Sequence, residues 1–267
     1  MPHTSSSEHI TFIRADGHRL RVLSIEPPQQ AAGSPTLVFL HEGLGSIEQW
    51  RDFPRLLGAA TDCRAVVYDR YGFGGSDPLQ ERRTVAYLEH EAHHSLPEVL
   101  AACGVDRPIL IGHSDGGSIA LLYAARFPGQ PLGVITEAAH VFVEPITLTG
   151  IRAAVELFET SDLPERLARF HGERTDSMFR GWSDVWLSPE FARWNIEPCL
   201  GQITCPLLAI QGEDDQYGSI AQVQAIVGQV SGRADFALIP GCGHVPHHQA
   251  RSQVMAEMTR FITGLKK

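Results

Sequence analysis

The sequence lacks the features that mark disulfide-stabilised, membrane-spanning and nucleic-acid-binding chains. Its five cysteines are odd in number, lie far apart and form no C-x-x-C pair, which is typical of reduced core residues in a cytoplasmic protein. No apolar run approaches the roughly 20 residues that a membrane helix needs. Basic residues form no cluster and the net charge is −9, so neither nucleic acid nor a membrane surface is an expected partner.

Composition and length indicate an ordinary globular protein. Residues 1–8 have neither a basic segment nor an apolar one, so we expect no secretory signal. Hydrophobic residues make up 43% of the chain and charged residues 20%. A length of 267 residues allows one large domain or two small ones. No internal repeat or low-complexity linker is visible, and we expect a single domain, residues 1–267.

Short apolar segments predict the strands of a sheet. Residues 9–26 contain two alternating segments around a turn at residues 15–18, which predicts an antiparallel hairpin. Later segments are continuous apolar runs, as expected for strands buried on both faces. These runs are residues 36–40, 64–68, 109–111, 133–136, 206–210 and 235–239.

Helical patterns lie between these strands. Apolar residues recur at helical spacing over residues 50–57, 85–103, 220–227 and 254–265. Alternation of strand and helix predicts the α/β class, with a mainly parallel, doubly wound sheet covered on both faces. Ligands are then expected at the carboxyl ends of the strands.

One segment interrupts this alternation. Residues 141–202 lie between two late strands and are too numerous for a single crossover. The segment is rich in aromatic residues and contains two helix-like stretches, residues 151–160 and 164–172. We expect a helical lid inserted over the strand ends; the alternative is an insertion without a role at the site.

A G-H-S-D-G turn at residues 112–116 follows the strand at 109–111. An apolar, helix-length run follows it and ends at Pro128. Strand, G-x-S-x-G and helix together are typical of a nucleophile elbow, in which a sharp turn lifts the serine hydroxyl above the sheet edge. Such a turn strains the serine backbone and needs residues without side chains on either side. The sequence therefore predicts Ser114 as a nucleophile; the alternative is an ordinary glycine-rich turn.

A competing motif lies at residues 90–94, where H-E-A-H-H matches the H-E-x-x-H zinc signature. Position 92, however, belongs to the apolar stripe that faces the sheet. A catalytic zinc also needs a third ligand at an open site, and this helix is expected on the outer face of the sheet, away from the strand ends. We therefore expect no metal and no other cofactor.

Several ordered motifs carry a family resemblance. Ser114 is followed by Q-G-E-D-D at residues 211–215 and P-G-C-G-H at residues 240–244, each after a strand. Residues 41–45 are similar to an H-G-x-x-G oxyanion loop, and residues 69–76 match D-x-x-G-x-G-x-S. Over residues 36–262 the chain resembles the α/β-hydrolase superfamily. Glu42 departs from the pattern, because the family usually has glycine there.

The resemblance implies a catalytic triad of Ser114, Asp215 and His244. The family spacing G-x-x-D, counted from Gly212, selects Asp215 over Asp214. The spacing G-x-G-H selects His244 over the histidines at 247–248. In such a triad the imidazole takes the hydroxyl proton, and the carboxylate fixes its tautomer.

The resemblance further implies an oxyanion hole formed by the backbone N–H groups of Gly43 and Asp115. Two carboxylates have no evident use in ester hydrolysis, those of Glu42 and Asp115. Either one recognises a cationic or hydroxylated substrate, or Asp115 caps the following helix and Glu42 bonds to loop amides; we favour the second interpretation. His41 and His113 are expected to be structural neighbours in these loops.

A serine nucleophile restricts the reaction to acyl chemistry or C–C hydrolysis. Ring-cleavage C–C hydrolases usually have tryptophan directly after the catalytic histidine, where this chain has Val245. Trp182 and Trp186 are expected to contact a small-molecule substrate in a compact pocket. We expect a hydrolase of small carboxylic esters, lactones or thioesters that acts through an acyl-enzyme. The alternatives are a C–C hydrolase and a non-catalytic member of the fold that binds a small ligand; the oligomeric state stays open.

Overall fold

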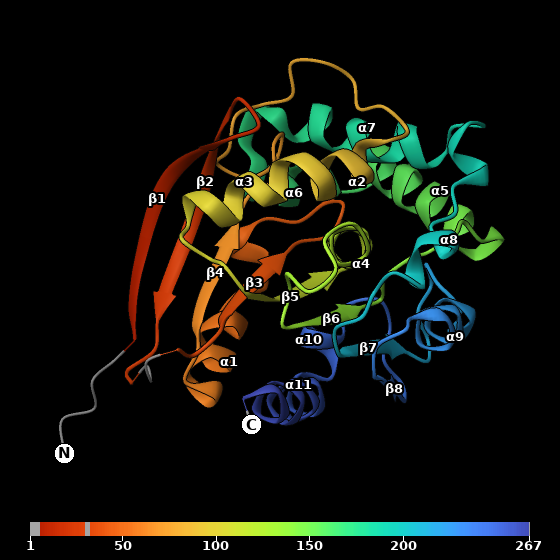
Figure 1. The fold of residues 1–267 in the computed structure, drawn as a ribbon. Coiled ribbons are helices and arrows are strands. Elements are labelled where there is room, and N and C mark those ends of the chain that lie inside the picture. The colour runs from red at the N-terminus through yellow and green to blue at the C-terminus, as the bar shows by residue number, and fades with distance from the viewer. Residues whose placement is uncertain (1–5, 30–32, 267) are drawn as a thin grey trace.

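The fold is built on one eight-stranded sheet, with the strand order β1-β2-β4-β3-β5-β6-β7-β8 (Figure 1). It was obtained as a computed structural model that describes residues 6–29 and 33–266. The prediction for residues 1–8 therefore lies partly outside the described residues. The strands are β1 (Ser7–Ala15), β2 (His18–Glu26), β3 (Thr36–Leu40), β4 (Arg64–Tyr68), β5 (Pro108–His113), β6 (Gly133–Glu137), β7 (Leu207–Gly212) and β8 (Ala234–Ile239).

Strand pairing confirms the predicted hairpin and the mainly parallel sheet. β1 pairs with β2, and β2 with β4, in antiparallel fashion, and the other neighbours are parallel. The hairpin turns at Asp16 and Gly17, whose φ angles of 52° and 76° are accessible to aspartate and glycine at little cost. The carboxyl ends of β3, β5, β6, β7 and β8 consequently lie along one edge of the sheet.

Helices cover both faces of the sheet, which confirms the doubly wound class. α1 and α11 lie on one face, and α3, α4, α8 and α9 lie on the other (Figure 1). The helices are α1 (Phe53–Thr61), α2 (Tyr87–His90), α3 (Leu96–Ala102), α4 (Asp115–Arg126), α5 (Pro145–Thr160), α6 (Leu163–His171), α7 (Thr175–Trp186), α8 (Glu197–Leu200), α9 (Ile220–Gln229), α10 (Pro246–Gln249) and α11 (Arg251–Leu265).

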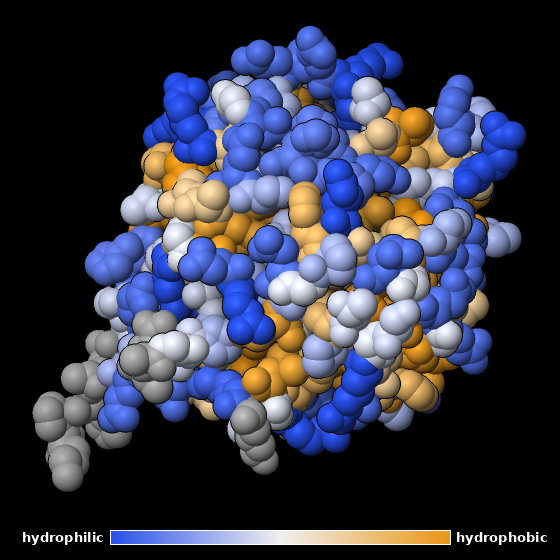
Figure 2. Space-filling view, in the orientation of Figure 1, coloured by the Kyte–Doolittle hydropathy of each residue, from blue (hydrophilic) through white to orange (hydrophobic). Residues whose placement is uncertain are grey.

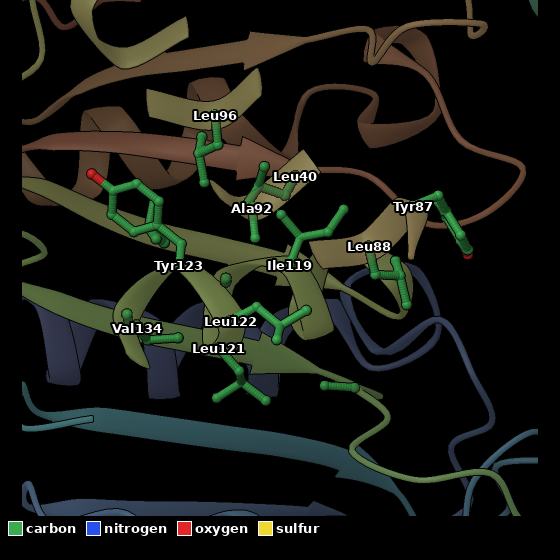
Figure 3. Packing of buried hydrophobic residues seen from close by; sticks show 14 of the residues in the cluster. Leu40, Tyr87, Leu88, Ala92, Leu96, Ile119, Leu121, Leu122, Tyr123 and Val134 are labelled. Carbon is green, nitrogen blue, oxygen red and sulfur yellow. The ribbon is translucent and has the colours of Figure 1, made fainter. Parts of the chain in front are cut away.

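Helix α4, which follows the predicted nucleophile, is buried along almost its whole length. In Figure 3 its Ile119 and Leu122 point toward Leu88 and Ala92, and Val134 of β6 lies beside the helix. Each fully buried aliphatic side chain of this kind contributes about 1.5–3 kcal/mol. The packing makes α4 a rigid support for the turn that precedes it.

The helix predicted over residues 85–103 is present as one continuous run of helical turns, but its geometry is irregular. It begins at Tyr87, and Val85 lies before it, 42% exposed. Between α2 and α3 the chain forms one π-helical turn, Glu91–Ser95. Pro97 supplies the physical reason, because it has no N–H for the regular helical bond and the chain widens ahead of it.

Between β6 and β7 the structure has four helices, α5–α8, where the sequence predicted two. Helix α5 starts at Pro145, six residues before the predicted start, because proline is favoured in a first helical turn. Helix α7 was missed, although Met178, Trp182 and Val185 recur at helical spacing on its buried side. Helices α5, α6 and α7 lie together beyond the strand ends (Figure 1).

The surface carries mixed polarity. Figure 2 shows separate hydrophobic areas among hydrophilic residues on one face of the molecule. No helix in the described part of the chain combines the length and the hydrophobicity needed to cross a bilayer.

Candidate active site

The turn between β5 and α4 has the strained geometry expected of a nucleophile elbow. Ser114 has a φ of 52° and a ψ of −117°. Residues other than glycine adopt this backbone conformation only where the surrounding structure imposes it. A Cβ at position 112 would lie 2.1 Å from the carbonyl oxygen of Gly116, and a Cβ at position 116 would lie 2.0 Å from that of Leu40. Close backbone packing therefore requires both glycines, as a nucleophile elbow does.

The structure brings the three predicted triad residues together. The Oγ atom of Ser114 lies 3.0 Å from Nε2 of His244. The Nδ1 atom of His244 lies 2.8 Å from Oδ1 of Asp215 and 2.9 Å from Oδ2. Ser114 follows β5, Asp215 follows β7 and His244 follows β8, so neighbouring strand ends present side chains that are distant in sequence. All three residues are buried.

The environment of Asp215 keeps its carboxylate ionised. Burial opposes ionisation, but hydrogen bonds from His244 and from the backbone N–H of Tyr217 lower the pKa of Asp215 below its ordinary value. The side-chain amide of Gln211 also donates to Oδ2, at 2.7 Å. Asp214 is exposed, so the structure supplies no comparable surroundings for it.

The two later histidines, His247 and His248, lie in the short helix α10. His247 is buried, and both its backbone N–H and its Nδ1 contact the Oε2 atom of Glu137, at 2.9 and 3.1 Å. Burial lowers the pKa of His248 to about 4. His247 thus ties the segment that carries His244 to the end of β6. Sequence reasoning missed Glu137; a carboxylate that ends an apolar strand was the available signal.

The predicted oxyanion donors lie in the loop after β3 and at the start of α4. The backbone N–H groups of Gly43 and Asp115 make no hydrogen bond within the described residues. A Cβ at position 43 would lie 2.3 Å from the Trp182 ring, so the loop packs directly against α7. The guanidinium group of Arg70 donates to the carbonyl oxygens of His41 and Glu42, at 3.3 and 3.0 Å, and these bonds hold the loop in place.

The side chain of Asp115 does not cap α4, so that interpretation was wrong. Its carboxylate accepts a hydrogen bond of 2.6 Å from the Tyr87 hydroxyl and lies 3.6 Å from Arg70. The Tyr87 hydroxyl in turn accepts a bond of 2.8 Å from Nε1 of Trp186. The aspartate is therefore part of a buried polar network that connects the elbow with α7.

Glu42 also has a partner other than the expected loop amides. Its Oε2 atom lies 3.4 Å from Nδ1 of His113, and Nε2 of His113 lies 2.6 Å from the backbone carbonyl oxygen of His244. His113 is 1% exposed. The histidine therefore lies between the oxyanion loop and the segment that carries the predicted base.

A cavity of about 480 Å³ opens at Ser114 and His244. Trp182 and Trp186, the predicted substrate contacts, line it together with Glu42. An apolar wall comes from α5 and α6 (Ile151, Ala154, Leu157, Leu163 and Leu167). The cavity suits a small, partly apolar molecule with its reactive group at Ser114.

The H-E-x-x-H segment lies away from this cavity. The rings of His90 and His94 stack 4.9 Å apart, and Nε2 of His90 lies 2.5 Å from the Asp16 carboxylate. Glu91 is buried and lies 3.6 Å from Arg83. Within residues 6–29 and 33–266, no three histidine, cysteine or acidic side chains gather in a metal-binding group.

Chelation of metal ions is expected to leave the activity of the protein unchanged. The Ser114 site needs no Lewis acid when an imidazole activates the hydroxyl. Hydrolysis of an ester is measured before and after dialysis against EDTA, with His94→Gln as a companion variant. Loss of activity on chelation that added zinc restores, together with loss in His94→Gln, would contradict this expectation.

Comparison with known proteins places the sequence among hydrolases. Residues 37–257 match the family described as "Alpha/beta hydrolase family". A 2-hydroxy-6-oxo-6-phenylhexa-2,4-dienoate hydrolase of Burkholderia cepacia is 25% identical over 80% of this chain and 82% of its own length. A 2-hydroxy-6-oxononadienedioate/2-hydroxy-6-oxononatrienedioate hydrolase of Dechloromonas aromatica is 28% identical, over 87% and 88%.

Solved structures show the same fold. The enol-lactonase of Burkholderia xenovorans LB400 superposes with a TM-score of 0.73, at 17% identity, over 95% of this chain and all of its own. A proline iminopeptidase of Mycobacterium smegmatis superposes with a TM-score of 0.72, at 18% identity, over 96% and 98%. At these identities the likeness concerns the fold alone.

Proposed function

This chain belongs to the alpha/beta hydrolase family, and on that basis we propose that it is a serine hydrolase of small carboxylic esters, lactones or thioesters. One observation carries the proposal: the Ser114 hydroxyl lies 3.0 Å from an imidazole whose other nitrogen lies 2.8 Å from a buried carboxylate. This arrangement activates a hydroxyl that is otherwise a weak nucleophile near neutral pH.

The proposed reaction proceeds through an acyl-enzyme. Ser114 Oγ attacks the carbonyl carbon while His244 Nε2 takes the hydroxyl proton, and the backbone N–H groups of Gly43 and Asp115 stabilise the oxyanion. The intermediate collapses, and the imidazolium gives its proton to the leaving oxygen or sulfur. Water then attacks the acyl-enzyme, His244 takes one proton from it, and the carboxylic acid leaves as Ser114 regains its hydrogen. Asp215 holds the imidazole tautomer and stabilises the imidazolium throughout.

The cavity favours neutral acyl groups. Its wall from α5 and α6 is aliphatic, and Arg166 is the only lysine or arginine among its described lining residues. The side chain of Arg166 is 56% exposed and lies 3.5 Å from Asp162, so it sits at the mouth and has an acidic partner. Glu42 adds a carboxylate near the reaction centre. These charges do not suit a substrate with two carboxylates.

A second candidate is hydrolysis of a C–C bond, because the two bacterial relatives above carry names of dienoate hydrolases. Such a substrate ends in a carboxylate and would need a cation without an acidic partner in the cavity, where Arg166 is the only lysine or arginine of the described lining. Val245 also stands where those enzymes usually have tryptophan. We therefore rank C–C hydrolysis below ester hydrolysis.

We further propose how the chain is organised around this reaction. Residues 1–267 form one domain, and residues 141–202 act as its lid, since α5, α6 and α7 all contribute to the cavity wall. The partner is a small-molecule substrate, with no metal or other cofactor. The cytoplasmic location stays a prediction.

Covalent labelling by a fluorophosphonate is expected to modify Ser114 and no other serine. Mass spectrometry of the digested adduct locates the label, and Ser114→Ala should abolish it while the exposed Ser161→Ala leaves it unchanged. A folded protein that does not label would favour the non-catalytic, ligand-binding alternative. A screen of p-nitrophenyl esters, lactones and a dienone acid then separates ester from C–C hydrolysis.

A further inference from the structure

We infer that His113 is a positioning residue: as an imidazolium it neutralises Glu42 beside the oxyanion loop and anchors the backbone of His244. The inference rests on the proposed hydrolase function. It concerns His113 and Glu42, which have no role in the triad mechanism. From the sequence alone we expected His113 to be a structural neighbour and Glu42 to bond to loop amides.

The contacts of His113 favour a hydrogen on both ring nitrogens. Its Nε2 atom lies 2.6 Å from the carbonyl oxygen of His244, and its Nδ1 atom lies 3.4 Å from Oε2 of Glu42. Both partners accept hydrogen bonds and neither donates one. A neutral imidazole has one N–H and satisfies only one of these contacts, whereas the imidazolium satisfies both.

Electrostatics favour the same protonation state. Burial alone would lower the pKa of His113, but the carboxylate of Glu42, followed by that of Glu137, raises it above the ordinary value. Reciprocally, burial would raise the pKa of Glu42, but the hydrogen bond and charge of His113 hold it far below its usual range. Both shifts favour an oppositely charged pair of the buried His113 and the partly exposed Glu42.

The pair explains how a carboxylate is tolerated at position 42, where the family usually has glycine. Glu42 directly precedes Gly43, whose N–H is proposed to bind the oxyanion, and it lines the same cavity as Ser114. An uncompensated negative charge there would oppose the negative charge that develops on the substrate oxygen. The imidazolium of His113 compensates this negative charge. The same side chain also fixes the position of His244 through its bond to the carbonyl oxygen of that residue.

A pH dependence follows from this pair. The raised pKa means that the stabilising charge is complete below about 6.5, the value for an unperturbed histidine, and is lost as the pH rises through the folded-state value. Activity should therefore fall on the basic side as Glu42 loses its counter-ion. The titratable groups that face His113 from neighbouring elements are Glu42, Glu137, His244, His247 and His248.

Two substitutions separate the two tasks of His113. Gln places its amide near the position of the Nε2 donor and keeps the bond to His244, but it removes the charge opposite Glu42. Asn keeps a donor near Nδ1 and loses the bond to His244. We expect kcat to fall about 10-fold in His113→Gln, because the charge of Glu42 is then uncompensated. We expect a fall of about 100-fold in His113→Asn, because small displacements of a catalytic group cost rates of this order.

Removing the carboxylate should rescue the charge defect. Glu42→Gln combined with His113→Gln is expected to return kcat to within about 3-fold of the wild type, since coupled residues give non-additive effects. Glu42→Gln alone should lose the basic limb of the pH–kcat profile. His94→Gln, an exposed histidine far from the cavity, should match the wild type throughout.

The outcomes distinguish this inference from the proposed function. If the wild type neither hydrolyses esters nor labels at Ser114, the proposed function fails. If the wild type is active but His113→Gln retains its kcat, or Glu42→Gln gives no rescue, the inference alone is overturned. Should His113→Gln fail to fold by circular dichroism, an unchanged basic limb in Glu42→Gln overturns the inference, and its disappearance supports it.

Discussion

Ester hydrolysis is expected to fall by about 10⁴- to 10⁶-fold in kcat when Ser114 is replaced by alanine, with KM nearly unchanged. The reason is that no acyl-enzyme can form without the Oγ atom of Ser114, whereas the cavity walls that bind the substrate remain. Side chains of a triad act as a unit, so removing the nucleophile alone costs nearly as much as removing all three.

The other two side chains give the matched comparisons. His244→Ala should lose activity to a similar extent as Ser114→Ala, and the double variant should lose no more than either single one. Asp215→Asn is expected to cost about 10⁴-fold, because the amide holds the wrong imidazole tautomer. Asp214→Asn changes an exposed carboxylate and should remain within a few-fold of the wild type. Losses that add across Ser114 and His244 would show that they do not work together.

Local signals account for the parts of the fold that the sequence predicted well. Strands β3 and β4 begin and end at the predicted residues, because strands covered on both faces leave continuous apolar runs. The elbow was equally visible, since only glycine permits the approach of 2.1 Å between a Cβ position at residue 112 and the Gly116 carbonyl oxygen. Both constraints act within a few residues of chain.

Side-chain contacts between residues that are far apart in the sequence were not predictable in the same way. Glu42 lies 71 residues from His113, and Tyr87 lies 28 residues from Asp115. A carboxylate in a loop looks the same in sequence whether it faces solvent, caps a helix or pairs with a buried cation. Only the packing of β5, α2 and the oxyanion loop decides among these, so the cap favoured for Asp115 was wrong and the pairing of Glu42 with His113 was not foreseen.

Replacing Arg70 with methionine is expected to destabilise the protein by about 3–5 kcal/mol, although Arg70 belongs to none of the proposed catalytic groups. Arg70 is fully buried, lies 3.6 Å from Asp115 and donates to the carbonyl oxygens of His41 and Glu42. Methionine fills much of the same volume, so the cost comes from the charge rather than from a cavity.

The buried charges around Arg70 balance one another, which sets the expected pattern of rescue. Arg70 and Arg83 face Asp115 and Glu91, two cations against two anions. Removing one cation leaves an unpaired negative charge in the interior, whereas Arg70→Met with Asp115→Asn restores neutrality and should recover more than half of the lost stability. Urea unfolding, extrapolated linearly to water, measures each difference.

A surface arginine supplies the control for this experiment. Arg55 on α1 is 40% exposed and lies 3.8 Å from both Glu8 and Asp52, so Arg55→Met should change stability by less than about 1 kcal/mol. If Arg70→Met were as stable as Arg55→Met, the charge on Asp115 would have another source of compensation. The network from the elbow through Tyr87 to Trp186 would then hold α7 by hydrogen bonds alone, and Tyr87→Phe should destabilise the protein more than Arg70→Met does.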